Sequence, residues 1–169
     1  SILSYLIFFV EKFNYIKIRI FSFLDSSSNS YSQAEKASEA IIDGGFFGKG
    51  IGEGTLNSKI PEAHTDFIVS VISEEFGIII ILMIMLVLIF FAYIIFKKIR
   101  STNDNVFKMI LTGLISLLLM QAFVHVGVNL RVLPTTGMTL PYLSYGGSSI
   151  ISISIVSGII LNLTKRRVY

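Results

Sequence analysis

One apolar stretch decides the fold: Phe76-Gly-Ile-Ile-Ile-Ile-Leu-Met-Ile-Met-Leu-Val-Leu-Ile-Phe-Phe-Ala-Tyr-Ile-Ile-Phe96. It has no charged side chain and about the 20 residues that a helix needs to cross a bilayer. Two more uncharged runs follow it. Because 53% of all residues are hydrophobic and only 15% are charged, the chain lacks the surface of a soluble domain. We therefore predict an all-α polytopic membrane protein with transmembrane helices over residues 67–96, 109–130 and 142–164.

The remaining composition narrows the class of protein. Ser1–Val10 is apolar but too short to cross a bilayer, so we interpret it as the end of a fourth transmembrane helix, with an interfacial segment as the alternative. The sequence has no Cys, which excludes thiol chemistry and Cys-ligated metal or haem. The net charge of +3 does not indicate a nucleic-acid partner, because the basic residues lie in short loops beside the spans.

Those basic residues also predict the orientation. They form two clusters separated by two spans, one at Lys97, Lys98, Arg100 and Lys108 and one at Lys165, Arg166 and Arg167. Loops rich in Lys and Arg stay in the cytoplasm. We therefore place residues 97–108 and 165–169 in the cytoplasm. Residues 11–66, a large loop, and residues 131–141 then lie on the extracytoplasmic side.

The large loop begins with two recognisable segments. Residues 15–24 alternate polar and apolar side chains, which indicates a strand or a segment lying in the membrane interface. Ser32 to Ile42 predicts a short helix that is capped by Ser30 or Ser32. Glycines follow directly and end it.

Residues 44–54 hold six glycines around Lys49. A nucleotide-binding Walker loop requires Ser or Thr after Gly-Lys, but Gly50 follows here, so no nucleotide is expected. Two interpretations remain. The glycines permit a tight loop on the membrane surface, or the backbone N–H groups and Lys49 bind an anionic lipid headgroup.

The end of the loop carries Glu62, His64 and Asp66 at alternate positions. In an extended segment all three side chains point the same way and would hold a divalent cation or relay a proton. Alternatively, Glu62 or Asp66 caps the following helix and His64 is a structural hydrogen-bonding residue. A charge at the edge of a span is itself a functional-site hypothesis. Glu74 and Glu75 imply that this helix start is buried in protein or faces a wet cavity.

The last extracytoplasmic stretch, residues 133–149, combines two prolines with small polar residues. Irregular backbone at membrane depth requires a protein neighbour or a cavity. Its glycine–serine end therefore either packs closely on another helix or forms a pocket wall facing the Asp66 segment. Gln121 and His125, four residues apart, are better explained as an interhelical hydrogen-bonding pair than as a catalytic pair.

Five strings, in this order, resemble the SEDS family of bacterial cell-wall synthesis proteins: Gly44-Gly-Phe-Phe-Gly-Lys-Gly-Ile-Gly-Glu-Gly54, Pro61-Glu-Ala-His-Thr-Asp-Phe-Ile68, Glu74-Glu-Phe-Gly77, Leu133-Pro-Thr-Thr-Gly-Met-Thr-Leu-Pro141 and Ser144-Tyr-Gly-Gly-Ser-Ser149. Glu62-Ala63 and residues 135–139 favour the division branch, FtsW, over RodA. The resemblance implies the C-terminal portion of a roughly ten-helix fold: the end of helix seven, the large outer loop and helices eight to ten.

The resemblance also implies a function. Family members are peptidoglycan glycosyltransferases that polymerise lipid II into glycan strands and release undecaprenyl diphosphate. Their partners are a class B penicillin-binding protein and other division proteins, in the bacterial inner (cytoplasmic) membrane at the division septum. The family's essential acid falls on Asp66.

We assign the expected roles accordingly. Asp66 is the catalytic residue, because a carboxylate within hydrogen-bond reach can take the proton of an attacking sugar hydroxyl. Glu62 and His64 orient Asp66 or share a divalent cation with it, Mg or Mn, whereas no nucleotide or haem is expected. The remaining substrate-binding candidates are Lys49, Lys59 and Arg131, whose charge would compensate a leaving diphosphate, and Ser144, Tyr145, Gly146, Gly147 and Ser148.

Two departures from the family pattern qualify these expectations. His125 stands where many relatives have Asn, which puts an Asn-specific role there in doubt. The first six helices of the family fold have no counterpart in these residues, so we expect this portion alone to be inactive. Two other functions stay open: a lipid II flippase, which also needs a polar cavity and broken helices, and a non-catalytic scaffold for division proteins.

Overall fold

The computed structural model describes residue 21, residues 29–60 and residues 63–165. Within this part the regular elements are all helices: α3 (Asn29–Gly44), α4 (Leu56–Lys59), α5 (Ile68–Phe76), α6 (Ile78–Ser101), α7 (Asn105–Asn129) and α8 (Gly147–Thr164). The predicted all-α fold is confirmed. The predictions for Ser1–Val10 and, apart from Phe21, for residues 15–24 fall outside the described residues.

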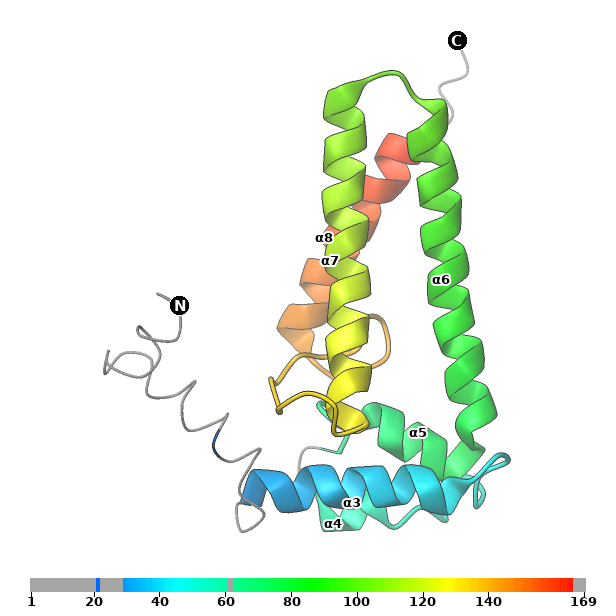
Figure 1. The fold of residues 1–169 in the computed structure, drawn as a ribbon, viewed down its shortest axis with the longest axis vertical. Helices are drawn as coiled ribbons and strands as arrows, with labels where there is room; N and C mark the ends of the chain where they lie inside the picture. Colours follow the sequence, from blue (N-terminus) through cyan, green and yellow to red (C-terminus); the bar gives the residue numbers. More distant parts are fainter. Residues whose placement is uncertain (1–20, 22–28, 61–62, 166–169) are drawn as a thin grey trace, which may run out of the picture.

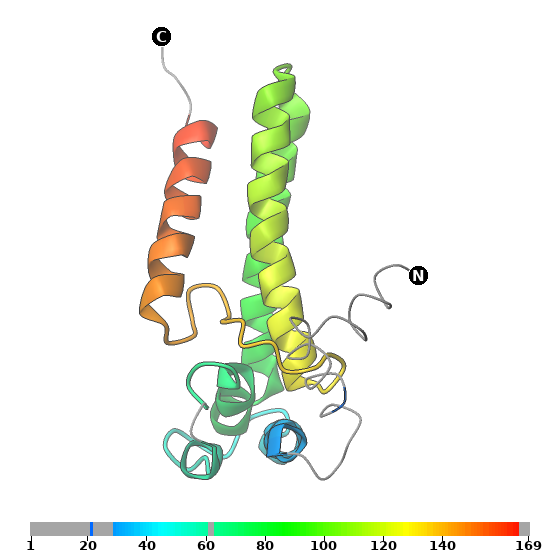
Figure 2. The same cartoon turned by 90° about the vertical axis from the view of Figure 1, so that its left-hand side faces the viewer.

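The helices form two layers. α6, α7 and α8 run steeply, with α6 and α7 side by side, while α3, α4 and α5 lie across one end of them (Figures 1 and 2). The turn between α6 and α7 and the end of α8 lie together at the far end from α3 (Figure 1). Lys165 and the basic cluster at the α6–α7 turn therefore share one end and the Asp66 segment lies at the other, as the charge pattern requires. The side of the membrane that each end faces stays a prediction.

Three described helices are long and apolar enough to cross a membrane: Ile78–Ser101, Asn105–Asn129 and Gly147–Thr164, of 24, 25 and 18 residues. At 1.5 Å per residue these lengths correspond to about 36, 37 and 27 Å, close to the ~30 Å hydrocarbon core of a bilayer. The three predicted spans thus have helical counterparts in the structure.

Gly77 divides the predicted helix over residues 67–96 into two. Its φ of 84° and ψ of 168° end α5, and α6 begins at Ile78 in a new direction. A Cβ at this position would lie 2.1 Å from the Phe46 carbonyl oxygen, so only glycine allows the loop to approach. The single-helix prediction was therefore wrong at its start, because α5 is apolar enough to look like part of the span.

Other helix ends also differ from the predicted ones. α3 begins at Asn29, so Ser30 and Ser32 lie inside the helix rather than at its cap. α7 begins earlier than predicted, because the Asp104 carboxylate accepts hydrogen bonds from the N–H groups of Val106 at 2.9 Å and Phe107 at 3.4 Å. α8 begins only at Gly147, which leaves residues 142–146 in the preceding loop.

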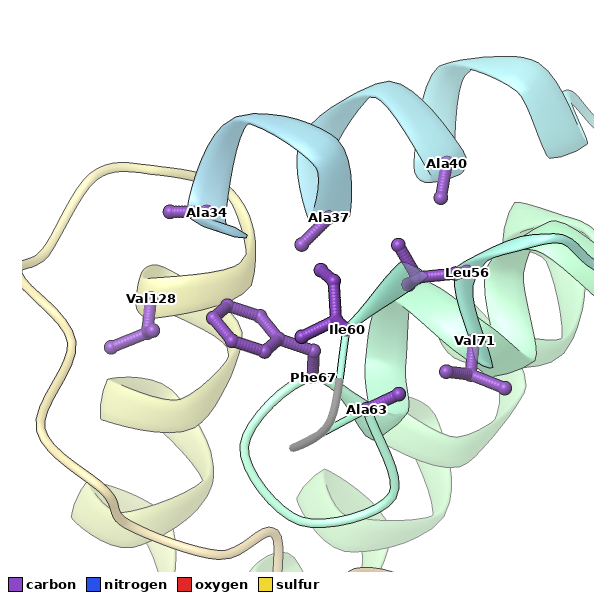
Figure 3. Packing of buried hydrophobic residues seen from close by; sticks show 9 residues of the cluster. All are labelled: Ala34, Ala37, Ala40, Leu56, Ile60, Ala63, Phe67, Val71 and Val128. Atoms are coloured by element: carbon purple, nitrogen blue, oxygen red, sulfur yellow. The ribbon is translucent and has the colours of Figure 1, made fainter. Parts of the chain in front are cut away.

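The lower layer has its own apolar core, shown in Figure 3. Small side chains on one face of α3 let this helix pack closely against α5. The Phe67 ring lies between Val128 and Ile60 (Figure 3). The core consists of Ala34, Ala37, Ala40, Leu56, Ile60, Ala63, Phe67, Val71 and Val128. Because Val128 belongs to α7, this core joins the loop layer to the upright helices.

The upright helices pack through two further clusters. One joins α6, α7 and α8 through Ala92, Ile95, Leu111, Ile115, Leu118, Ile153 and Ile160. The other lies nearer the loops and joins α5, α6, α7 and the loop before α8 through Val69, Ile81, Ala122 and Leu140. Where these contacts lie between membrane-spanning helices, van der Waals packing rather than removal from water stabilises them, because lipid tails are as apolar as the side chains.

Four of the hydroxyl groups of α8 are satisfied inside the helix. Those of Ser152, Ser154, Ser157 and Thr164 each donate to the carbonyl oxygen four residues earlier, at 2.6–2.9 Å. Ser and Thr commonly make this bond in the middle of helices.

We expect Gly77→Ala to lower the free energy of unfolding by about 2 kcal/mol or more, because alanine at this φ is strained and its methyl group meets the Phe46 carbonyl. Thermal unfolding of the purified protein in detergent measures the change. Gly113→Ala is the matched control: Gly113 lies within α7 with no atom within 4 Å of its Cβ position. Equal losses in both variants would contradict the assignment.

Candidate functional site

Asp66 lies in a turn over residues 63–66, immediately before α5. The turn replaces the extended conformation that would have pointed Glu62, His64 and Asp66 the same way. Asp66 is half-buried and His64 is exposed. Glu62 lies outside the described residues. The N-cap residue of α5 is Phe67, one position after Asp66.

One side chain from α7 holds this turn. The Asn129 amide nitrogen donates to the Asp66 carbonyl oxygen at 3.0 Å and to the His125 carbonyl oxygen at 2.8 Å. The Asn129 amide oxygen accepts from the N–H and the hydroxyl of Ser70, at 3.2 and 2.8 Å. The Asn129 side chain is fully buried, so it contributes four hydrogen bonds in a water-free environment.

His125, one turn earlier on α7, contacts the same segment. Its Nε2 lies 3.3 Å from the Thr65 carbonyl oxygen, and 3.4 Å from the Ser144 hydroxyl oxygen. A carbonyl oxygen only accepts, so Nε2 carries the hydrogen and Nδ1 is left as an acceptor facing the Asn129 amide nitrogen at 3.4 Å. The interpretation of His125 as a hydrogen-bonding residue between elements is confirmed.

α7 also fixes the loop before α8. The Gln121 amide nitrogen donates to the Thr139 carbonyl oxygen at 2.9 Å. The Ser144 hydroxyl oxygen accepts from the Leu140 N–H at 2.8 Å, and the Tyr145 N–H donates to the His64 carbonyl oxygen at 3.1 Å. The Asp66 turn and the 139–145 loop are thus held against each other and against α7.

A cavity of about 410 Å³, lined by both hydroxyl-bearing and apolar side chains, opens beside this junction. It lies between α7, α8 and the 137–139 loop and is lined by Leu117, Gln121, Gly137, Met138, Thr139, Ser148, Ser149, Ser152, Ile153 and Val156. A Cβ placed on Gly137 would lie 3.8 Å from Asp66 Oδ2, which puts the carboxylate next to the cavity wall. This agrees with the interpretation of the glycine–serine segment as a pocket wall.

Within that segment the candidates differ in surroundings. Ser148 lines the cavity, and the Ser144 side chain is buried. Tyr145 is 78% exposed. The Gly146 Cβ position is 3.4 Å from the Thr139 methyl carbon, whereas among the described residues nothing lies within 4 Å of that of Gly147. Close helix packing is therefore not what Gly147 provides in this part of the chain.

An apolar groove of about 400 Å³ lies near the 139–145 loop. It is bounded by α6 and the residues just before α8, and its lining is Ile80, Met83, Ile84, Val87, Leu88, Pro141, Tyr142 and Leu143. Tyr142 has a φ of 66° and its hydroxyl is 2.7 Å from the Ser157 hydroxyl oxygen. A bulky residue in the left-handed region is a strained conformation of the kind found at functional sites.

Of the three predicted basic residues, Lys49 lies at the other end of α5 from Asp66. The backbone N–H of Lys49 donates to the Glu74 carbonyl oxygen near the end of α5, whereas Asp66 lies before the start of α5. The nine residues of α5 separate its two ends by about 13 Å. Lys59 is exposed at the end of α4. Arg131, with a φ of 58°, pairs with Glu35 at 3.8 Å.

Glu74 anchors the glycine-rich loop. Its carboxylate is buried and accepts from the N–H groups of Thr55 and Leu56, both at 3.0 Å, and from the Lys49 ammonium at 3.2 Å. Burial raises the pKa of Glu74, but these backbone hydrogen bonds and Lys49 outweigh it, so the pKa lies below its usual value. Asp43 and then Glu74 raise the pKa of Lys49 through their hydrogen bonds.

Glycine is also needed where this loop meets α5. A Cβ on Gly48, whose φ is 79°, would lie 2.2 Å from the Glu75 carbonyl oxygen. The tight-loop interpretation of the glycines is supported here. The start of α5 is buried in protein, as Glu74 and Glu75 predicted, since Ser70, Ser73 and Glu74 are all nearly inaccessible.

The described residues do not by themselves complete a cation site. Neither Asp66 nor His64 belongs to any group of three or more His, Cys, Asp or Glu side chains within ligating reach in residues 29–60 and 63–165. Mg²⁺ and Mn²⁺ usually require several oxygen ligands. Glu62, the third predicted ligand, lies outside the described residues, so the divalent cation stays a prediction and we derive no reaction step through one.

Comparison with known proteins identifies the family. The model of the family that comprises FtsW, RodA and SpoVE, described as cell cycle protein, matches residues 1–169. The chain belongs to this family. The resemblance seen in the five sequence strings is thereby confirmed, and with its three apolar helices the chain is that of a multi-pass membrane protein.

Several relatives carry the name probable peptidoglycan glycosyltransferase FtsW. That of Caulobacter vibrioides (strain NA1000 / CB15N) is 37% identical over 92% of this chain and 40% of its own length. That of Geobacter sp. (strain M18) is 40% identical over 88% of this chain and 41% of its own. The chain therefore spans about two fifths of the length of these FtsW proteins.

A solved structure supports the fold. One chain from the work titled "Structural coordination of polymerization and crosslinking by a peptidoglycan synthase complex" matches with a TM-score of 0.68 and 26% identity. The match covers 96% of this chain and 46% of the other. The helix arrangement described above is thus shared with about half of that chain.

Sequence reasoning did not assign a role to Asn129, although it contacts Asp66 directly. The available signal was a polar side chain in the last turn of an apolar span, four residues after His125. Polar groups at such a position require partners. The sequence does not show which segment supplies them, because Ser70 and Asp66 are about 60 residues away.

We expect Glu74→Gln to lower the free energy of unfolding at neutral pH by about 1–3 kcal/mol, the usual cost of weakening buried hydrogen bonds to a charged group. Because the folded-state pKa of Glu74 is lowered, its stabilisation is present above the usual Glu pKa of 4.5 and is lost as pH falls through the folded-state pKa. Thermal unfolding in detergent between pH 3 and 7 checks both points. An unchanged acid dependence in Glu74→Gln would refute the assignment.

Proposed function

We propose that the protein is a peptidoglycan glycosyltransferase that polymerises lipid II into glycan strands during cell division. One observation carries the proposal: the half-buried Asp66 is fixed by α7 beside a hydroxyl-lined cavity at the loop end of three membrane-spanning helices. The FtsW names of its relatives support the same reaction.

Asp66 would serve as the general base. A sugar hydroxyl of one lipid-linked disaccharide attacks the anomeric carbon of another chain, and the carboxylate takes the hydroxyl proton as the new C–O bond forms. The bond from the anomeric carbon to the diphosphate oxygen breaks, and undecaprenyl diphosphate leaves with the bonding electrons. Proton and charge then balance without a nucleotide or a redox partner.

The surroundings of Asp66 suit the other parts of such a substrate. Thr139, Ser148, Ser149 and Gln121 line the cavity and offer hydrogen bonds to sugar groups. The apolar groove beside α6 offers a surface for the isoprenoid tail. Arg131 and Lys59 remain candidates to compensate the diphosphate charge, whereas Lys49 is engaged by Asp43 and Glu74. Ser144 and Tyr145 would act by shaping the loop over Asp66.

We propose the partners and place of action on the same basis. A class B penicillin-binding protein would cross-link the strands, in the bacterial inner membrane at the septum, together with other division proteins. The family description as cell cycle protein and the similarity to a chain of a peptidoglycan synthase complex support this assembly.

Asp66→Asn tests the reaction in a full-length family protein that carries this sequence, assayed with its penicillin-binding partner on purified lipid II. We expect polymer formation to fall by about 10²–10⁴-fold, the usual contribution of a general base, with folding and partner binding kept. Glu53→Gln, which removes an exposed carboxylate from the glycine-rich loop, is the control and should stay within about twofold of wild type.

Normal polymerisation by Asp66→Asn would reject the base assignment. A variant that loses lipid II translocation but not polymerisation would favour the flippase function. Loss of partner association alone would favour the scaffold function.

A further inference from the structure

We propose that Asn129 is the positioning residue for Asp66, acting by holding the Asp66 carbonyl group and the first turn of α5 with a single amide. The proposal rests on the proposed function in one respect, because it takes Asp66 as the reacting carboxylate. The clamp itself is a structural statement that holds or fails independently of the reaction.

Asn129 makes full use of its amide. Its two N–H groups donate to the Asp66 and His125 carbonyl oxygens, and its oxygen accepts twice from Ser70. An Asn side chain has two donor hydrogens and two acceptor lone pairs, so no capacity is left over. Complete burial of Asn129 and Ser70 excludes water as a substitute partner.

The bond to the Ser70 N–H completes α5. The first N–H groups of a helix need acceptors from outside it, and the N-cap residue Phe67 has no side-chain cap bond. Asn129 supplies that acceptor from a different helix. The amide thus does for α5 what an N-cap side chain normally does, and ties the helix start to the end of α7.

The same amide fixes the chain on both sides of Phe67. Asp66 is held at its carbonyl oxygen and Ser70 at its N–H, while the Phe67 ring is buried in the lower core. The Asp66 backbone therefore has little freedom to move relative to α7. α7 also carries Gln121, which bonds to the Thr139 carbonyl oxygen in the cavity wall. The backbone of Asp66 and the cavity wall are therefore both held by α7.

Asn129→Asp separates the clamp from general packing. The variant keeps the size of the side chain and the acceptor for Ser70, but places an oxygen against the Asp66 and His125 carbonyl oxygens. We expect kcat for lipid II polymerisation to fall about 10- to 100-fold with KM within about threefold, because sub-ångström misplacement of a base costs rate rather than binding. Asn105→Asp is the control: it makes the same change at the exposed first residue of α7, far from the clamp, and should leave kcat within about twofold.

A second measurement follows the turn directly. The Tyr145 N–H bonds to the His64 carbonyl oxygen, so these two residues are neighbours only while the turn is docked. The sequence has no Cys. The pair His64→Cys and Tyr145→Cys, in a full-length protein otherwise free of cysteine, therefore reports whether the turn stays docked. We expect Asn129→Asp to slow disulfide formation between them by at least about fivefold. This result does not depend on the reaction, so it separates failure of the clamp from failure of the proposed function.

Wild-type kcat and wild-type cross-linking in a folded Asn129→Asp protein would overturn the proposal. If that variant does not fold, Asn129→Ser, which is smaller and retains a donor, takes its place with the same readouts. Failure of both variants to fold would assign Asn129 to folding alone and would also overturn the positioning role.

Discussion

A buried amide on α7 is the contact on which the rest of the site depends. The Asn129 side chain bonds to the backbone of Asp66 and to the start of α5, and so joins a surface turn to a membrane-spanning helix. Without it, the carbonyl of Asp66 and the N–H of Ser70 would be buried without these partners, at a cost of about 1–3 kcal/mol each. The short helix α5 is thus stabilised from outside rather than by its own cap.

A second constraint acts at the other end of α5. Glycine permits the loop after α3 to lie against the backbone of residues 73–77, and buried Glu74 fills the space between them as the acceptor for three N–H donors. The carboxylate is needed there because no apolar side chain can satisfy these groups. Both ends of α5 are therefore fixed by polar contacts, while its sides pack through apolar ones.

The sequence predicted what depends on composition and local pattern. The apolar runs predicted the three spans. The lysines and arginines predicted that the α6–α7 turn and the end of α8 lie at the same end of the molecule. The motif strings identified the family. The sequence did not reveal the break at Gly77, because the residues of α5 lead directly into the apolar run, nor the turn at residues 63–66. These features arise from contacts between distant segments, Phe46 with Gly77 and Asn129 with Asp66, that local periodicity does not encode. Likewise Lys49 was grouped with Asp66 by charge, although the fold separates them.

The self-contained hydroxyls of α8 affect how this helix behaves in hydrocarbon. It is the least hydropathic of the three spans, yet three of its serines and its threonine donate their hydroxyl hydrogens to the helix's own carbonyl oxygens. A hydropathy scale counts each such group as fully hydrated in water, whereas here most of the transfer penalty into lipid is already offset within the helix. Residue-by-residue hydropathy therefore understates the affinity of α8 for the bilayer.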